Sequence, residues 1–132
     1  MSNDFFKMRG IVKQYQMGNE VQTILKGIDL DIEEGEFLSI LGPSGCGKTT
    51  TLRIIGGFEK PDAGDVFFAS QRINDVPPNK RNINTVFQKY ALFPHLNVAE
   101  NIAFGLNIRK VDKKEVARRV EEMLELVNLK GF

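Results

Sequence analysis

The spacing of apolar residues predicts three strands in the first third of the chain. Residues 5–12 are rich in apolar side chains and lead into the turn-forming run Q-M-G-N at residues 16–19, which predicts a strand and a loop. Residues 28–32 alternate apolar side chains with aspartate, the pattern of a half-buried strand. Residues 37–41, F-L-S-I-L, form the short apolar run that is typical of a buried strand.

The middle of the chain mixes one helix with further strands. Residues 49–55 predict a helix that two glycines, at positions 56 and 57, bring to an end. The run P-D-A-G at residues 61–64 predicts a turn, and residues 66–68 and 83–87 predict strands.

Two helices are expected in the last third. Asn97 with Glu100 has the spacing of a capping box and predicts a helix from residue 98, and Asp112 with Glu115 repeats that signal. The second helix places one apolar face along Val116, Val120, Met123, Leu124 and Val127. A C-cap is expected at Gly131. Strands followed by mixed strands and helices indicate an α/β or α+β architecture.

Composition narrows the class of protein. The chain has 132 residues, 42% hydrophobic and 27% charged, with a net charge of +1, as in one soluble globular domain or part of one. The balanced charge argues against nucleic acid as a partner. One cysteine and one histidine exclude an internal disulfide and a dedicated zinc cluster. We expect no secretory signal at the N-terminus and no membrane-spanning run, so that membrane association would come through a partner.

The strongest chemical signal is the run G-P-S-G-C-G-K-T at residues 42–49, which fits G-x-x-x-x-G-K-[ST] at every fixed position. It lies between an apolar predicted strand and a predicted helix, as a phosphate-binding loop requires. Its three glycines let successive backbone N–H groups turn into one concavity, and the helix start adds further donors. The alternative is a glycine-rich turn with a solvated lysine.

Each polar side chain of the loop has an expected role. Lys48 brings a positive charge to the β- and γ-phosphates, the Thr49 hydroxyl is a ligand for Mg²⁺, and Thr50 lies near the α-phosphate. Threonine is a poor helix former, so three threonines at residues 49–51 suggest that their hydroxyls matter. Cys46 is either a redox-sensitive thiol beside a helix start or a small residue at a tolerant position.

Three segments resemble the ATPase subunits of ABC transporters. The run G-P-S-G-C-G-K-T-T at residues 42–50 resembles their Walker A loop, T-V-F-Q-K-Y-A-L-F-P-H at residues 85–95 is similar to their Q-loop segment, and residues 98–106 continue the match. At residues 56–58 this chain has G-G-F where the family usually has A-G-L. The resemblance extends from about residue 6 to residue 132.

The resemblance implies a fold and a division of the chain. The fold class is α/β, a P-loop NTPase-type core with an N-terminal antiparallel β-subdomain, truncated before the signature motif and the Walker B strand. The β-subdomain and Walker A loop would occupy about residues 1–90, and the Q-loop with the start of a helical subdomain about residues 88–132.

The resemblance also implies roles for single residues. Tyr15 matches the aromatic that stacks on adenine, Ser44 faces the γ-phosphate in the closed dimer, and Gln88 gives an oxygen to Mg²⁺ and reports the nucleotide state. Lys48 and Gln88 are thus the expected catalytic residues, and Thr49 and Gln88 the expected metal ligands. The expected set for ATP is Tyr15, Gly42, Pro43, Ser44, Gly45, Cys46, Gly47, Lys48, Thr49 and Thr50.

Partners follow from the apolar loop at residues 90–94, which is either an exposed contact surface or core. The resemblance implies that residues Gln88–His95 receive a coupling helix of a membrane permease, and that a second ATPase subunit pairs with this one. A solute-binding protein would act indirectly, and the subunit would lie at the cytoplasmic face of the cell membrane, peripherally through the permease. Residues 87–106 look most like importers of the spermidine/putrescine group, although iron, maltose and sulfate importers share much of the segment.

The printed sequence ends before three family features: the signature loop L-S-G-G-Q, the strand ending in Asp-Glu, and the switch histidine. Because phosphoryl transfer depends on positioned charges, we expect no meaningful turnover from these 132 residues alone. Two other readings stay open, namely a non-hydrolytic or inert fragment and a soluble ABC ATPase of translation or DNA repair. The charge balance argues against the last.

Overall fold

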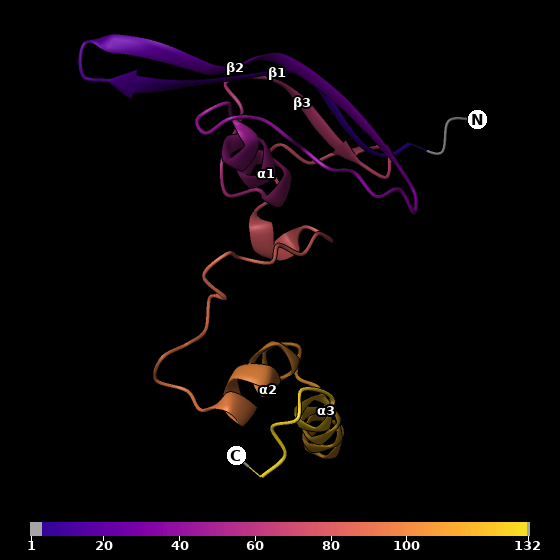
Figure 1. Cartoon of the computed structure of the whole chain (residues 1–132). Helices are drawn as coiled ribbons and strands as arrows, with labels where there is room; N and C mark the ends of the chain where they lie inside the picture. The colour runs from indigo at the N-terminus through magenta and orange to yellow at the C-terminus, as the bar shows by residue number, and fades with distance from the viewer. Residues whose placement is uncertain (1–3, 132) are drawn as a thin grey trace. The chain divides into compact units, whose positions relative to one another are not determined.

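The computed structural model describes residues 4–131. Residues 1–3, part of the N-terminus for which no secretory signal is expected, and residue 132 lie outside this part. The chain divides into two compact units, Met1–Thr85 (unit 1) and Val86–Phe132 (unit 2), which are taken in turn (Figure 1). The predicted domain bounds near residues 88–90 stay a prediction.

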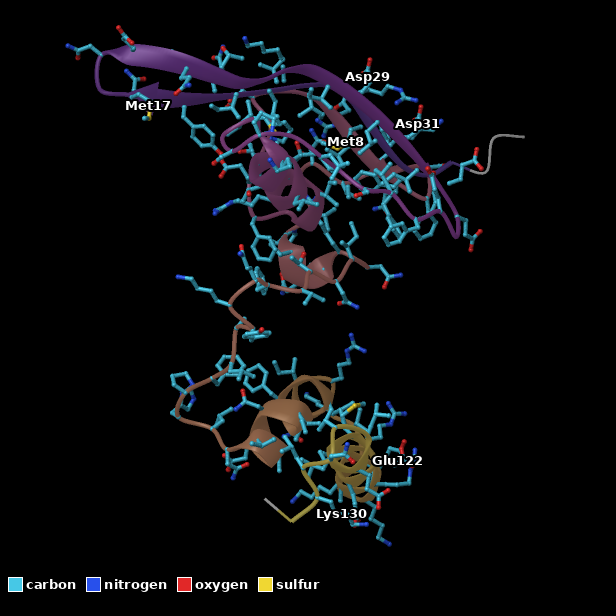
Figure 2. The ribbon with its side chains drawn as sticks, in the orientation of Figure 1. Met8, Met17, Asp29, Asp31, Glu122 and Lys130 are labelled. Carbon is cyan, nitrogen blue, oxygen red and sulfur yellow. The ribbon has the colours of Figure 1, made fainter. Side chains whose placement is uncertain are left out.

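Unit 1 contains a four-stranded antiparallel sheet in the order β2-β1-β3-β4. Its strands are β1 (Asp4–Met17), β2 (Glu20–Glu33), β3 (Ala63–Phe68) and β4 (Gln71–Arg72). The predicted strands at residues 5–12, 28–32 and 66–68 are confirmed, but β1 runs on to Met17, which Figure 2 shows at the end of the β1–β2 hairpin. The turn shrinks to two residues, and Gly18 takes the positive φ of 65° that a tight hairpin needs.

The core of unit 1 lies between this sheet and helix α1 (Lys48–Gly56) (Figure 1). Met8, Ile11, Val66 and Ile54 are fully buried, and Ile54 comes from the helix. Gly57, in the left-handed region at φ 81°, ends α1 where the sequence predicted. Burying side chains from both elements fixes the helix against the sheet, and with it the loop that precedes the helix.

Two predicted strands do not form. Residues 37–41 and 83–87 have no ladder partner within the described residues. Their apolar side chains are largely exposed, with Phe37 at 94%, Leu41 at 89% and Val86 at 96%. An apolar run becomes a strand only when another strand supplies its hydrogen bonds, and no segment of residues 4–131 does so here. These two predictions are therefore wrong for this structure.

Arg81 joins separate segments of unit 1. Its guanidinium donates to the carbonyls of Ile54 and Ile55 at the end of α1, each at 2.9 Å, and to those of Ile73 at 2.7 Å and Val76 at 2.8 Å. The bonds to Ile54 and Ile55 reach the last turn of α1, where a helix leaves carbonyls available to other donors. Burial lowers the pKa of Arg81.

Unit 2 contains α2 (Val98–Ile108) and α3 (Lys113–Leu126), which pack against each other. The capping box at α2 is confirmed: Asn97 accepts from the Glu100 N–H at 2.9 Å, and Glu100 accepts from the Asn97 N–H at 2.8 Å.

The second capping box is only half formed. Asp112 caps α3 by accepting from the Lys114 N–H at 3.0 Å, but the Glu115 carboxylate accepts from Arg118 and Arg119 instead. These two arginines lower the pKa of Glu115 to about 2. Three charge-assisted bonds from these two arginines replace the one bond that Glu115 would accept from a backbone N–H in a capping box.

The expected C-cap at Gly131 is also wrong. Helix α3 ends at Leu126, and Asn128 takes the left-handed conformation at φ 58°. The Leu129 N–H then donates to the Leu124 carbonyl at 2.8 Å, and the Asn128 N–H donates to the Glu125 carbonyl at 3.0 Å. This is a Schellman ending built on asparagine, which tolerates a left-handed backbone better than other non-glycine residues.

Candidate nucleotide-binding site

The loop at residues 42–47 uses glycine where the backbone is left-handed. Gly45 has φ 81° and Gly47 has φ 96°. Gly47 is also buried, and a Cβ atom there would lie 2.6 Å from Cδ2 of Leu25 and 3.3 Å from Cγ2 of Ile24. The loop therefore packs directly against β2 at Gly47, and any movement of Gly47 away from β2 would break this contact.

Helix α1 begins at Lys48 with open donors. Gly47 is its N-cap, no side chain caps the helix, and its first turn holds no acidic residue. The N–H groups of a first helical turn have no partner within the helix and carry a partial positive charge. An anion placed at this helix start would supply the missing acceptors.

Lys48 folds back along the loop. Its ammonium donates to the carbonyls of Gly42 at 2.5 Å and Pro43 at 2.8 Å, and lies 3.4 Å from the sulfur of Cys46. The positive charge is therefore held over the loop by backbone oxygens rather than by a carboxylate.

Two side chains of the loop face solvent while its backbone is tightly packed. Ser44 and Cys46 are exposed. A Cβ atom on Gly42 would come within 2.6 Å of the Cys46 sulfur, so the loop is tight at its start even though its outer side faces solvent.

The three threonines after Lys48 are not equivalent. Thr49 is exposed, Thr50 is half-buried and Thr51 is buried. The Thr51 hydroxyl donates to the Gly47 carbonyl at 2.9 Å, so its role is to hold the helix start together. Only Thr49 and Thr50 keep hydroxyls for a ligand.

Tyr15 lies in the same unit as the loop, half-buried on β1 and opposite Gln22 of β2. Two residues earlier, Lys13 pairs with Leu25, the residue beneath Gly47. The Lys13 ammonium lies 5.4 Å from the centre of the Tyr15 ring. The β1–β2 hairpin therefore links the tyrosine to the loop through neighbouring residues.

Lys13 is the residue that the sequence reading missed. It is only 8% exposed, and its ammonium lies 3.0 Å from Glu59, 3.4 Å from Asp62 and 2.9 Å from the Lys60 carbonyl. Burial disfavours the charged form, but Glu59 and Asp62 outweigh it and raise the pKa of Lys13. The available signal was its position two residues after Ile11, on the inward side of β1.

Gln88 belongs to unit 2, where it is exposed in a turn. Tyr90 and Ala91 follow with left-handed backbones, at φ 61° and 49°. Tyr90 is 83% and Leu92 69% exposed. The apolar loop at residues 90–94 is thus exposed at its start.

The same loop is anchored at its end. The ring of Phe93 packs on that of Phe104, with centroids 4.2 Å apart. Asn101 of α2 accepts from the Phe93 N–H at 2.9 Å and donates to the carbonyls of Phe93, Leu96 and Asn97 at 3.0–3.2 Å. Beside it lies an apolar groove of about 420 Å³, lined by Leu92, Phe93, Pro94, Leu96, Asn97, Val98, Asn101 and Ile102.

The described residues hold neither a cluster of metal ligands nor a helix that could span a membrane. Among residues 4–131, no three His, Cys, Asp or Glu side chains gather as a metal site. No helix in that same range combines the length and apolar character needed to cross a membrane.

The motif G-x-x-x-x-G-K-[ST] at residues 42–49, its left-handed glycines and the uncapped helix start at Lys48 are the features of a phosphate-binding loop, although the expected strand before the loop does not form. The chain belongs to the ABC transporter family, because the family model described as "ABC transporter" matches residues 25–132. The predicted family and fold class are confirmed.

Curated relatives match the whole chain. It is 57% identical over 132 residues to the spermidine/putrescine import ATP-binding protein PotA of Clostridium novyi (strain NT), and 52% identical over 132 residues to that of Mesoplasma florum. Each alignment covers 100% of this chain and 37% of the relative. The chain thus spans little more than a third of the length of these relatives.

The fold is similar to that of a solved ATP-binding cassette. A dimeric, post-hydrolysis state of the ATP-binding cassette MJ0796, bound to ADP and Pi, is 36% identical with a TM-score of 0.82. The match covers 96% of this chain and 58% of that chain.

Proposed function

We propose that this chain forms the ATP-binding part of the ATPase subunit of an ABC importer whose solute is a polyamine such as spermidine or putrescine. The main support for a nucleotide site is the start of helix α1 at Lys48, which no side chain caps and which follows two glycines with left-handed backbones. The names of relatives 52–57% identical to the chain support the importer and the solute.

The proposed binding step is an exchange of partners by Lys48. Its ammonium now donates to the carbonyls of Gly42 and Pro43, which are neutral acceptors. A phosphate oxygen carries negative charge and attracts the ammonium more strongly than a neutral carbonyl does, so Lys48 would move to the β- and γ-phosphates of ATP. The backbone N–H groups of residues 44–50 would donate to the same oxygens, among them that of Cys46, which now donates to the Pro43 carbonyl at 3.3 Å. Pro43 has no N–H and would contribute only to the shape of the loop.

Mg²⁺ would neutralise charge on the phosphates when it is bound. The exposed Thr49 hydroxyl fits this ion, which prefers oxygen ligands, and the Gln88 amide oxygen is the second proposed ligand. Thr50 would contact the α-phosphate and Tyr15 would stack on the adenine. Tyr15 presents the flat aromatic surface that a heterocycle needs.

The proposed partners are those of an importer. The exposed loop residues Tyr90 and Leu92, within the Gln88–His95 region, offer an apolar surface to a coupling helix of the membrane permease. A second ATPase subunit would complete the ATP site, and a solute-binding protein would act indirectly. The chain would lie at the cytoplasmic face of the cell membrane through the permease.

Calorimetric titration with Mg-ATP tests the nucleotide site. We expect saturable binding by the 132-residue chain. Lys48→Ala should abolish it, whereas Lys26→Ala, at an exposed lysine on β2, should leave it unchanged. Binding that is the same in all three proteins would overturn the proposal.

A phosphate-release assay on the same preparation tests the enzymatic part. We expect ATPase activity in the complete subunit and no meaningful turnover from the 132 residues alone. Release at the rate of a complete ABC ATPase would show that this division of roles is wrong.

A further inference from the structure

The ammonium of Lys13 has a fixed position in unit 1. Three oxygens hold it, from the Glu59 carboxylate at 3.0 Å, the Lys60 carbonyl at 2.9 Å and the Asp62 carboxylate at 3.4 Å. Asp62 is itself fixed, because it accepts from the Gln14 N–H at 2.6 Å. A lysine side chain is otherwise flexible, so three acceptors on one short segment are what keep this cation in place.

This fixed cation lies against an aromatic ring. The Lys13 nitrogen is 5.4 Å from the centroid of Tyr15, within the range of a cation–π contact. The contact is strengthened by burial, since Lys13 is 8% exposed and little water competes. The ion pairs account for a lysine that stabilises the fold at this position. They do not account for the contact between its ammonium and the Tyr15 ring.

A cation on one face of a ring changes what the opposite face can do. It holds the ring in one orientation, and it draws π-electron density toward itself. The opposite face then repels the π-electrons of a stacked base less strongly. Tyr15 is half-buried, so part of its surface remains open to a partner.

We propose that Lys13 is a positioning residue for the nucleotide base, acting through Tyr15. The lysine fixes and polarises the ring from one side, and the base stacks on the other. This inference rests on the proposed function, in which Tyr15 stacks on adenine.

The test separates the base from the phosphates. Mg-ATP and Mg-tripolyphosphate, which lacks a base and sugar, are titrated into the 132-residue chain and its variants. Lys13→Met should weaken ATP binding roughly threefold to tenfold and leave tripolyphosphate binding unchanged. Lys48→Ala should weaken both ligands, and the matched control Lys26→Met should weaken neither.

A second variant guards against misfolding. Lys13→Gln keeps a donor for the Lys60 carbonyl but removes the charge. We expect it to lose ATP affinity as Lys13→Met does, while Lys13→Arg, which keeps a cation, should recover most of it. Loss of tripolyphosphate binding in both uncharged variants would show that Lys13 supports the loop only, and would overturn the inference.

Tyrosine emission gives a direct readout. The chain has two tyrosines and no tryptophan, so a Tyr90→Phe background reports Tyr15 alone. ATP should change this emission, and Lys13→Met should reduce the change at saturating ATP.

Two failures are distinguishable. If Tyr15→Ala lowers ATP affinity but Lys13→Met does not, the inference fails while the proposed adenine contact stands. If Tyr15→Ala has no effect and Lys48→Ala still does, the adenine contact and the inference fall together, while the phosphate site stands.

Discussion

Two glycines of the phosphate-loop motif are required for different physical reasons. Gly45 has a left-handed backbone, but a Cβ atom there would meet nothing within 4 Å. Gly47 has the same kind of backbone and lies against Leu25, which is 2% exposed. The motif does not distinguish the two positions. In the structure, Gly45 is required by its backbone conformation alone, whereas Gly47 is required by its backbone conformation and by its packing against Leu25.

Alanine at each position separates these reasons. We expect Gly45→Ala to lower the free energy of unfolding by about 1–2 kcal/mol, the cost of a left-handed alanine. Gly47→Ala adds overpacking of the core and should cost about 1–3 kcal/mol more. Urea unfolding of the two variants measures the difference in free energy of unfolding. An equal decrease in both variants would show that the Leu25 side chain moves aside at no cost.

The threonines at positions 49 and 51 divide into a ligand and a structural residue. Thr51→Val removes the hydroxyl that donates to the Gly47 carbonyl at 2.9 Å, while the Thr51 N–H still donates to that carbonyl. We expect a loss of about 1 kcal/mol of stability, with no change in how ATP binding depends on Mg²⁺. Thr49→Val should leave stability within about 0.5 kcal/mol and weaken ATP binding only when Mg²⁺ is present. Thermal melts and titrations with and without Mg²⁺ check the pair. A stability loss at Thr49 or a magnesium effect at Thr51 contradicts the assignment.

At the scale of the element, most signals that involve neighbouring residues predicted the structure, although the second capping box formed only by half, and signals that need a distant partner did not. The capping box of Asn97 and Glu100 needs only residues three apart, and it forms as the sequence indicated. The strand at residues 37–41 needs a partner strand, which no local pattern can supply, and it does not form. Helix ends fall between these cases. The end of α1 at Gly57 was predicted, but α3 ends earlier than predicted, at a left-handed Asn128 and not at Gly131, which is also left-handed.

The candidate site shows the same division. The motif predicted the glycines, Lys48 and the helix start, because all lie within nine residues. It did not reveal Lys13, since the acceptors of that lysine lie 46 to 49 positions away along the chain. A contact between a strand and a distant connection depends on the packing of the whole sheet.

The contact between β1 and the α1–β3 connection should depend on pH. The pKa of Lys13 is raised from its ordinary 10.5, so its stabilisation is complete below that value and is lost as pH rises through the raised pKa. The Gln14 N–H and then Lys13 lower the pKa of Asp62 from its ordinary 3.8, so its contribution is complete above that value and is lost in more acidic solution.

We therefore expect the stability gap between the native chain and Lys13→Met to be greatest between about pH 4 and pH 10. Denaturant titrations across this range measure the gap. A gap that stays constant beyond both limits would show that the methylene stem of Lys13, and not its charge, stabilises the contact.

At the scale of the whole molecule, exposed apolar surface is the main consequence of the two runs that form no strand. Phe37 and Leu41 together present large side chains to solvent in unit 1. Large apolar side chains that are exposed to this degree can bind partners or promote association.

The double variant Phe37→Ser with Leu41→Ser should associate less at high concentration and bind less of a hydrophobic dye, because the exposed apolar surface is smaller. Sedimentation velocity over a concentration series checks this, with Lys26→Ser as the matched surface control. An unchanged sedimentation profile would mean that these side chains do not mediate association.

The four carbonyls bound by Arg81 have a consequence for the order of folding. They belong to the end of α1 and to the segment after β4, so the guanidinium has no complete set of acceptors until both are in place. We expect bonds with this requirement to form after the rate-limiting step of folding and to break before the rate-limiting step of unfolding. In stopped-flow experiments, Arg81→Met should unfold markedly faster than the native chain and refold at almost the same rate. The Arg81 side chain would then determine how long unit 1 stays folded, and not how fast it folds.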